Sequence, residues 1–206
     1  MIAIVDYGVG NLFSLKSSLA MIGFDAVVSG DADEIARAEK IILPGVGAFA
    51  DAAEKLRQTG LDRVVTEQAS GGKPVLGICL GMQLLFTRSF EYGEHAGLNL
   101  IPGDVVDMKP RIPAALKTPH IGWNALKLKQ PEHPLFRYIH EGDCVYFVHS
   151  FYADNCENAV LATAEYSVEL TAAVGKNNVL GCQFHPEKSG RVGLNILKAF
   201  CELEGA

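Results

Sequence analysis

The sequence predicts an α/β protein with a mixed sheet and helices on both faces, and three observations support this. Short apolar runs alternate with helical patterns over residues 1–90, which is typical of parallel strands that are buried on both faces. From residue 95 on, strand patterns follow one another with turns between them. A final helical pattern closes the chain at residues 189–203.

The first half of the chain is expected to alternate strand and helix. Each predicted strand is a short apolar run bounded by turn residues, at residues 2–6, 25–30, 40–45 and 73–78. Helices are predicted between them, at residues 12–23, 31–40, 48–60 and 61–70, and another begins at residue 80. Asn11 is a suitable N-cap for the first helix.

The second half is expected to consist mainly of strands. They are predicted at residues 100–109, 124–129, 144–154, 159–166, 170–175 and 179–184. The chain shows no internal repeat, low-complexity tract or long linker, and its 206 residues suffice for one sizeable core. We therefore expect a single domain over residues 1–206.

Composition and charge argue against several classes of function. The net charge is -6 and no dense Lys/Arg run occurs, which argues against nucleic-acid binding. The longest nearly apolar run, residues 74–86, is shorter than the roughly 18 residues that a membrane helix needs. The N-terminus lacks the basic region of a secretory signal. We therefore expect a cytoplasmic protein that binds neither membrane nor nucleic acid.

Two kinds of cofactor site are also argued against. The stretch YGVGN, residues 7–11, begins like a dinucleotide fingerprint but lacks its third glycine. The five cysteines contain no CxxC pair, and no His/Cys cluster has zinc spacing. We expect no metal and no cofactor, and four of the cysteines are expected to be inert small hydrophobes: Cys144, Cys156, Cys182 and Cys201.

The remaining cysteine, Cys79, lies in the stretch GICLG between a strand pattern and a helix pattern. A nucleophile elbow has this arrangement, because its sharp turn strains the central residue and Gly77 and Gly81 avoid collisions there. The nucleophile then projects above the carboxyl end of the sheet, and the Leu80 amide is free to face an oxyanion. The alternative for the pattern alone is a buried cysteine on a strand.

A base for this nucleophile is expected in QFHPE, residues 183–187, at the end of the last predicted strand. His185 and Glu187 are two residues apart in an extended segment, so their side chains leave the same face. A carboxylate beside an imidazole sets its tautomer and stabilises the imidazolium. A surface loop is the alternative for this motif alone, but an elbow cysteine and a strand-end His-x-Glu rarely coincide by chance.

A third piece is PGVG, residues 44–47, which follows the third predicted strand. In a parallel sheet this turn lies at the same carboxyl edge as Cys79, where such folds bind ligands. Gly45 and Gly47 allow the backbone to approach a substrate, or a peptide to turn its N–H toward one. A plain strand-to-helix turn is the alternative.

Together these three motifs resemble the class I, triad-type glutamine amidotransferases. The stretches at residues 7–11, 119–124 and 146–152 resemble one family among them, the glutaminase subunits of imidazole glycerol phosphate synthase. The resemblance runs from residue 2 to near the C-terminus. It implies a flavodoxin-like fold, release of ammonia from glutamine for histidine biosynthesis, and a cyclase subunit as a 1:1 partner.

The resemblance also implies roles for the residues of these motifs. Cys79 attacks the glutamine carboxamide, His185 transfers the proton, and Glu187 orients His185. The amides of Leu80 and Val46 hold the oxyanion, the latter after a peptide flip.

Further residues are expected around the substrate and the partner. Gln83 lies at i+4 from Cys79 and binds substrate by resemblance, and Glu91 is expected near its α-ammonium, with a solvated loop position as the alternative. The other substrate contacts are expected at His149, Ser150 and Phe151. For His149, a buried core histidine is an equally good alternative. Trp123 and Asn124 are expected at the partner interface, with partial burial within the chain as the alternative for Trp123.

Three other functions stay open from sequence alone. The chain could serve another synthase, such as that of pyridoxal phosphate, although the GWN and YGVGN stretches argue against it. It could be a non-catalytic regulatory chain, which the intact Cys79, His185 and Glu187 argue against. It could be a cysteine hydrolase for another amide, which Gln83 argues against.

Overall fold

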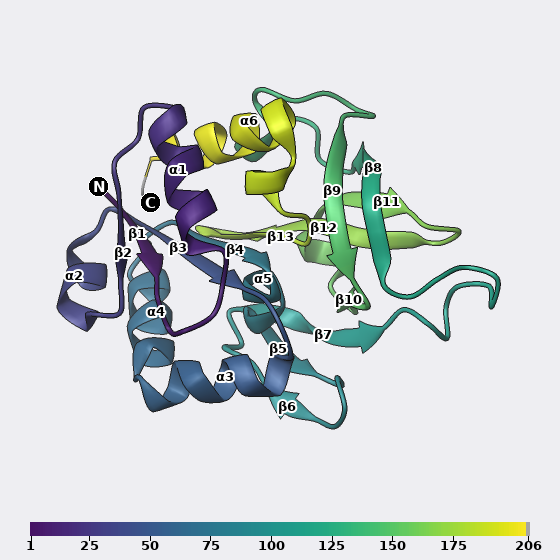
Figure 1. Cartoon of the computed structure of the whole chain (residues 1–206), viewed down its shortest axis with the longest axis horizontal. Coiled ribbons are helices and arrows are strands. Elements are labelled where there is room, and N and C mark those ends of the chain that lie inside the picture. The colour runs from purple at the N-terminus through teal and green to yellow at the C-terminus, as the bar shows by residue number, and fades with distance from the viewer. Residues whose placement is uncertain (205–206) are drawn as a thin grey trace.

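A nine-stranded mixed sheet runs through the computed structural model, which describes residues 1–204 (Figure 1). Its strand order is β2-β1-β3-β4-β13-β12-β11-β8-β9. The strands from β2 to β13 in this order are all parallel, and the remaining pairings are antiparallel. The predicted α/β fold with a mixed sheet is therefore confirmed, and its parallel half is the part built from the first 90 residues together with β13.

The strands and helices have the following bounds. The strands are β1 Ile2–Val5, β2 Ala26–Ser29, β3 Lys40–Gly45, β4 Val75–Cys79, β5 Phe86–Ser89, β6 His95–Ala96, β7 Ile101–Asp107, β8 His120–Leu128, β9 Cys144–His149, β10 Phe151–Asp154, β11 Val160–Glu165, β12 Glu169–Lys176 and β13 Val179–Cys182. The α-helices are α1 Leu12–Met21, α2 Ala32–Arg37, α3 Phe49–Gln58, α4 Leu61–Ser70, α5 Leu80–Leu84 and α6 Gly190–Cys201.

Helices cover both faces of the sheet. Helices α1 and α6 pack on one face, where Leu15, Leu19, Ile196 and Phe200 join a buried cluster with strand residues. Helices α3 and α4 cover the other face through Phe49, Leu56 and Val65, among other side chains. Figure 1 shows these two layers above and below the sheet. No helix within residues 1–204 is long and apolar enough to cross a membrane.

A smaller four-stranded sheet, in the order β10-β7-β5-β6, was not expected. The helix predicted from residue 80 ends at Leu84, and the chain enters strand β5 at Phe86. A short apolar run does not by itself distinguish helix from strand. Here the carbonyl of Leu85 accepts hydrogen bonds from Leu100 N and Ile101 N, at the start of β7. Pairing with a distant segment therefore ends the helix after little more than one turn.

The strand predicted over residues 144–154 is interrupted at Ser150. Strand β9 pairs with β8 in the large sheet, whereas β10 pairs with β7 in the small one. The Ser150 carbonyl accepts a hydrogen bond from Met108 N, just after β7. The chain thus changes sheets at Ser150.

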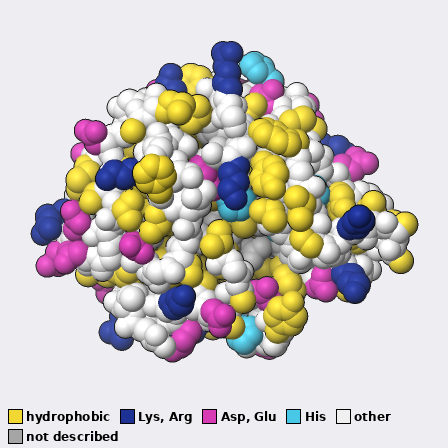
Figure 2. Space-filling model, in the orientation of Figure 1, with side chains coloured by type: hydrophobic (Ala, Val, Ile, Leu, Met, Phe, Trp, Pro, Cys, Tyr) yellow, Lys and Arg dark blue, Asp and Glu magenta, His cyan; other side chains and the backbone are white. Residues whose placement is uncertain are grey.

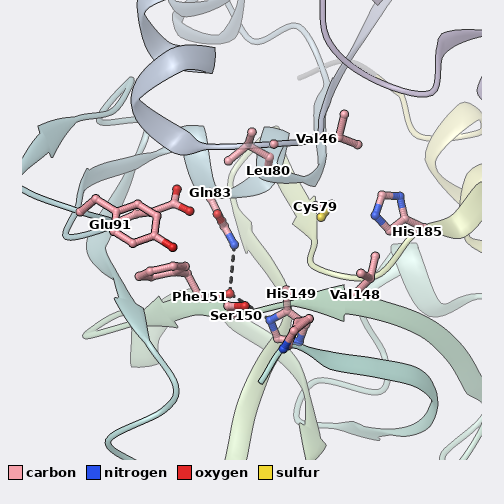
Figure 3. A pocket seen from close by; sticks show the side chains of 13 residues that line it. Val46, Cys79, Leu80, Gln83, Glu91, Val148, His149, Ser150, Phe151 and His185 are labelled. Atoms are coloured by element: carbon pink, nitrogen blue, oxygen red, sulfur yellow. Dashed lines mark hydrogen bonds between the residues drawn. The ribbon is translucent and has the colours of Figure 1, made fainter. Parts of the chain in front are cut away.

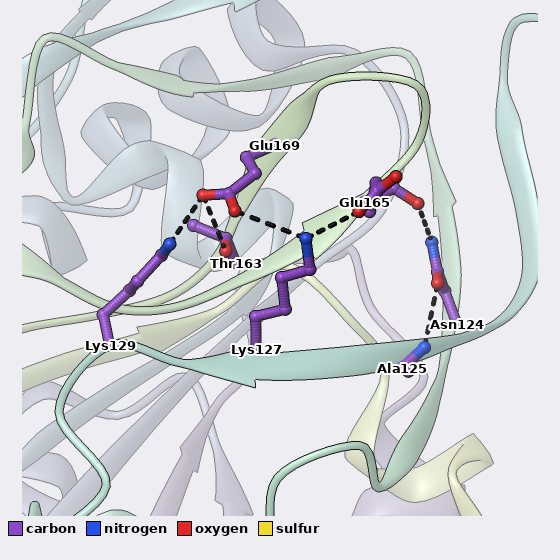
Figure 4. Close-up of polar contacts among 7 residues, drawn as sticks. All are labelled: Asn124, Ala125, Lys127, Lys129, Thr163, Glu165 and Glu169. Atoms are coloured by element: carbon purple, nitrogen blue, oxygen red, sulfur yellow. Dashed lines mark hydrogen bonds and ion pairs between the residues drawn. The ribbon is translucent and has the colours of Figure 1, made fainter.

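Exposed ion pairs connect the antiparallel strands β8, β11 and β12 (Figure 4). Lys127 Nζ lies 2.6 Å from Glu165 and 3.4 Å from Glu169, and Lys129 Nζ lies 2.7 Å from Glu169. All four side chains are more than 40% exposed, so each pair contributes at most about 1 kcal/mol to stability. The order of these strands therefore rests on the backbone pairing and the buried clusters beneath.

Candidate active site

Cys79 lies at a strained turn between strand β4 and helix α5. Its backbone has φ 54° and ψ -111°, in a region that residues with a side chain rarely adopt. The glycines around it are required by packing: a Cβ at Gly81 would collide with the Leu43 carbonyl, and one at Gly77 would lie 2.7 Å from the Gly81 carbonyl oxygen. This is the geometry of the predicted nucleophile elbow.

Helix α1 shows one departure from the expected local chemistry. Asn11 occupies the N-cap position as predicted, but its side chain makes no capping hydrogen bond. Its side chain lines a small cavity of about 10 Å³ together with Glu187. The start of α1 therefore lies directly behind the 185–187 segment.

His185 and Glu187 lie together at the carboxyl end of β13. His185 Nδ1 lies 2.9 Å from Glu187 Oε1, and both side chains are only 3% exposed. Because a carboxylate only accepts, Nδ1 carries the hydrogen and Nε2 remains for the thiol of Cys79. The segment is held from behind, since His185 N donates to Tyr146 O at 3.0 Å and Ser189 Oγ donates to His185 O at 2.6 Å.

The surroundings of His185 favour its protonated form. Burial lowers the pKa of this imidazole, but hydrogen bonding to Cys79 and Glu187, together with their charges, outweighs burial and raises the pKa to about 9. The imidazole is therefore protonated near neutral pH. That state suits an ion pair with a thiolate and a later proton transfer to a leaving group.

A pocket of about 330 Å³ opens in front of Cys79 (Figure 3). Of the residues expected at the site, those that line it are Val46, Gly47, Cys79, Leu80, Gln83, Glu91, His149, Ser150, Phe151 and His185. Tyr92, Pro119 and Val148 also line it. Figure 3 shows Glu91 across the pocket from Cys79 and His185. One end of a small elongated substrate would therefore lie near a carboxylate, and the other end near a thiol and an imidazole.

Gln83 is fixed by two hydrogen bonds to the protein. Its Nε2 donates to Phe151 O at 3.0 Å and to Gln183 Oε1 at 2.9 Å. Both amide hydrogens are thereby used, and only the Oε1 of Gln83 remains for a ligand in the pocket. Gln83 can therefore accept a hydrogen bond from a bound substrate but cannot donate one.

Glu91 is also held in place by a backbone group. Its Oε2 accepts a hydrogen bond from Phe49 N, the first residue of α3, at 2.6 Å. A carboxylate is favourable at a helix N-terminus. Glu91 is thus a positioned acceptor on the pocket wall rather than a freely solvated loop side chain.

His149 lies in a hydrogen-bonded chain of side chains beside the pocket. Its Nδ1 lies 2.9 Å from Phe151 O, its Nε2 lies 3.1 Å from His120 Nδ1, and His120 Nε2 lies 3.3 Å from Asn124 Nδ2. The carbonyl of Phe151 can only accept, so each histidine donates from Nδ1 and accepts at Nε2. Both ring nitrogens of His149 are used within the protein, and the ring is neutral.

Burial disfavours a charge on this histidine pair. Burial lowers the pKa of His149 to about 3 and also lowers the pKa of His120. In the unfolded chain His149 would take up its proton near pH 6.5. Between these two pH values the unfolded state binds more protons, so stability falls as the pH falls.

We expect His149→Gln to flatten this acid-side loss of stability. As the pH falls from 6.5 to 4.5, the wild type should lose more free energy of unfolding than the variant, by up to about 1.4 kcal/mol per pH unit. Urea unfolding at several pH values measures the difference. Equal pH slopes for the two chains would contradict the neutral, proton-excluding state assigned to His149.

Four of the expected residues lie outside the pocket. Gly45 and Glu187 line the small cavity behind it, and a Cβ at Gly45 would lie 2.7 Å from Gly81 N and 2.9 Å from the hydroxyl of Tyr7. Because glycine has no side chain, Gly45 allows β3 to pack closely against α5.

Trp123 and Asn124 lie on β8 and differ in exposure. Trp123 is 57% exposed and its neighbour Ile121 is 59% exposed, whereas the Asn124 side chain is half-buried and donates to Glu165 O at 2.8 Å. Trp123 is therefore the better candidate for contact with a partner. Figure 2 shows hydrophobic side chains spread over one face of the molecule, with charged side chains both among them and at the rim.

Besides the lining residues Tyr92, Pro119 and Val148, two residues that hydrogen-bond to side chains of the site were not predicted from the sequence. Gln183 lies within the stretch QFHPE and His120 within residues 119–124, so the motifs contained them without indicating a role. Their contacts, to Gln83 and His149, join positions 100 and 29 residues apart in the chain. No local pattern could reveal either contact.

The comparisons with known proteins agree with the geometry of the site. The family model for class I glutamine amidotransferases matches residues 3–202. Curated relatives carrying the name imidazole glycerol phosphate synthase subunit HisH include one from Caldanaerobacter subterraneus, 49% identical over 98% of both chains. Another, from Lacticaseibacillus casei, is 51% identical over 98% of this chain and 96% of that one.

Solved structures with the same fold are more distant in sequence. A glutamine amidotransferase crystal structure superposes with a TM-score of 0.75 at 18% identity, covering 98% of this chain and 100% of that one. The structure of PurLQS from Thermotoga maritima gives 0.74 at 21% identity, covering 97% and 96%. The fold expected from the resemblance is thus confirmed. The chain belongs to the class I glutamine amidotransferases and, within them, to the family of the imidazole glycerol phosphate synthase HisH subunits.

Proposed function

We propose that this chain is a glutaminase that hydrolyses L-glutamine to glutamate and ammonia and delivers the ammonia to a cyclase subunit of imidazole glycerol phosphate synthase, in histidine biosynthesis. The observation that carries the proposal is the strained Cys79 in front of the bonded pair His185 and Glu187, at the base of a pocket of about 330 Å³. We assign this activity to a single domain that works in the cytoplasm.

The chemistry begins with attack by the Cys79 thiolate on the substrate carboxamide carbon. A tetrahedral oxyanion forms, and the His185 imidazolium donates its Nε2 proton to the leaving nitrogen as the C–N bond breaks. A thioester to Cys79 remains. Water, deprotonated by the now neutral His185, attacks the thioester, and cleavage of the C–S bond releases glutamate and regenerates the Cys79 thiolate and the His185 imidazolium. Throughout, Glu187 holds the Nδ1 hydrogen of His185 and stabilises the imidazolium.

The oxyanion is stabilised by two backbone amides in this proposal. Leu80 is the first residue of α5, so its N–H has no partner within the helix. Val46 lies at the pocket edge, before Gly47 with its φ of +95°, and its N–H turns toward the substrate when the partner binds. Loss of one oxyanion donor costs about 2.7–4 kcal/mol of transition-state stabilisation, so this one amide can control the rate.

The remaining wall residues fix the amino-acid part of glutamine. Gln83 Oε1 and the Glu91 carboxylate are acceptors, which suits the α-ammonium group. The Ser150 and Phe151 backbone, where the chain changes sheets, holds the other end of the amino-acid moiety with His149 and Gly47 at its border. Recognition thus uses acceptors positioned by α3, α5 and β10.

The partner contact is assigned to the face that carries Trp123. A large aromatic side chain exposed on a strand is a frequent interface anchor. The Trp123 ring lies 6.2 Å from that of Tyr146, and Tyr146 O accepts the backbone N–H of His185. A partner bound there would sit one residue away from the triad. Delivery through a shielded route avoids the protonation and escape of ammonia in water.

The test is glutamate release by the chain alone, and again with the cyclase subunit and that subunit's nucleotide ligand. We expect low activity alone and a large increase in the complex. A free chain that is already as fast as the complex would contradict the control by Val46. No activity in either state, with the partner demonstrably bound, would contradict the glutaminase itself.

A further inference from the structure

A fully buried glutamine side chain touches the nucleophile. Gln183 is 0% exposed, and its Nε2 lies 3.6 Å from Cys79 Sγ. Strands β4 and β13 are parallel neighbours with Ile78 opposite Cys182. The residues that follow this pair are Cys79, the last of β4, and Gln183, directly after β13, so the sheet register places the amide beside the sulfur.

The direction of each hydrogen bond around Gln183 follows from one backbone carbonyl. Phe151 O can only accept, so Gln83 must present its amide nitrogen there, and the same nitrogen bonds Gln183. Gln183 must then offer its oxygen to Gln83, which leaves its own NH₂ group facing Cys79. The contact to Sγ is thus an N–H donor aimed at sulfur.

A hydrogen-bond donor at this position would stabilise the Cys79 thiolate, and the other groups around the elbow do little to stabilise it. Helix α5 has five residues, so its dipole is small and is only a weak support for a thiolate. The titratable groups facing Cys79 are His185, Tyr7 and Cys182. Burial raises the pKa of Tyr7 and of Cys182, so both are neutral at pH 7 and offer no positive charge.

More distant charged groups do not supply this support either. Glu187 is separated from Cys79 by His185, and Glu91 lies across the pocket. His149 on β9 is neutral. His185 is the one cation facing the sulfur among residues 1–204 in this arrangement, and it must give up its proton during each turnover.

We propose that Gln183 is a further catalytic residue, whose amide N–H stabilises the Cys79 thiolate while its oxygen holds Gln83 in place to accept from the substrate. One side chain then couples the nucleophile to substrate binding. The catalytic role of Gln183 rests on the proposed glutaminase function. Its effect on the ionisation of Cys79 can be tested without any glutaminase activity. A role limited to holding Gln83 predicts no effect on the ionisation of Cys79.

The experiment follows alkylation of Cys79 by iodoacetamide as a function of pH, read by mass spectrometry of the Cys79 peptide. The full chain is compared with Gln183→Met and with Gln183→Glu, which keeps an acceptor for Gln83 but loses the donor. Gln130→Met is the matched control, because this exposed glutamine also donates one hydrogen bond, to Val160 O, away from the pocket. The exposed Cys144 provides an internal reference for the reagent, and protection of the buried Cys201 reports folding.

We expect the midpoint of Cys79 alkylation to move up by about one pH unit in Gln183→Met, with about tenfold slower alkylation below the midpoint, as for loss of a hydrogen bond to a charged group. The shift in Gln183→Glu should be at least as large, because a carboxylate repels the thiolate. Gln130→Met should keep the wild-type midpoint.

An unchanged midpoint in Gln183→Glu, the variant closest in shape, would overturn the proposal. If Gln183→Met does not fold, judged by its melting curve and by alkylation of the buried Cys201, the Glu variant alone decides. A wild type that fails to hydrolyse glutamine with its partner would instead refute the proposed function and leave the alkylation result intact.

Discussion

Cys79→Ser should lower glutamine hydrolysis by about 10⁴-fold or more, because removal of a nucleophile leaves only the residual effect of binding and the oxyanion donors. A serine hydroxyl has nearly the shape of the thiol but does not ionise beside His185 near neutral pH. The strained backbone at position 79, with φ 54°, stays the same. The measurement is glutamate release by the variant in complex with the cyclase subunit.

The same variant separates the two halves of the reaction. With ammonium salt in place of glutamine, the complex of Cys79→Ser should still form imidazole glycerol phosphate, since ammonia then reaches the cyclase from solution. Cys144→Ser is the matched control, because Cys144 is exposed and outside the pocket. Glutamine hydrolysis by Cys79→Ser within tenfold of the wild-type rate would refute the nucleophile assignment.

Glu187→Gln should lower kcat by about 10³–10⁴-fold, as loss of the orienting carboxylate does in a triad. The 2.9 Å contact to His185 Nδ1 would become an amide contact, and an amide nitrogen there would force the hydrogen onto Nε2, the wrong side for taking the thiol proton. The carboxylate is also one of the causes that raise the pKa of His185 to about 9. The variant should therefore lose its imidazolium at a lower pH, which moves the alkaline limb of activity downward.

Stability should also fall in Glu187→Gln. The Glu187 carboxylate and the His185 imidazolium are both only 3% exposed, and removal of one partner leaves the other charge buried and unpaired. The melting temperature should therefore decrease near neutral pH, and the decrease should become smaller as the pH rises through the His185 pKa of about 9. The control is Glu132→Gln, an exposed glutamate outside both cavities. A variant that retains kcat within tenfold would contradict the orienting role.

The sequence was informative where local chemistry alone determines the structure. Gly77 and Gly81 on either side of Cys79 indicate an elbow because a side chain at either glycine would collide with the backbone of so sharp a turn, and the turn is there. His185 and Glu187 are two residues apart on an extended segment, which sufficed to predict their contact. The apolar runs of the first 90 residues likewise predicted the parallel strands, since burial on both faces leaves a composition that can be recognised.

The sequence was uninformative where partners come from distant segments. The run at residues 80–86 suits a helix, yet pairing with residues 98–101 ends the helix at Leu84. The break of the predicted 144–154 strand at Ser150 depends on β7, which offers a second sheet to join. In both cases, hydrogen bonding to a distant strand outweighs the weak helix or strand propensity of the local sequence.

By itself, then, the sequence indicated the residues proposed as nucleophile, base and orienting carboxylate and the edge of the sheet where they meet, because each lies within a few residues of a strand end. Only the tertiary structure decided how these groups are held. Gln183 reaches Cys79 because β13 lies beside β4 in parallel register, and His120 reaches His149 because β8 pairs with β9. Contacts across strands follow from register, and register is a property of the assembled sheet.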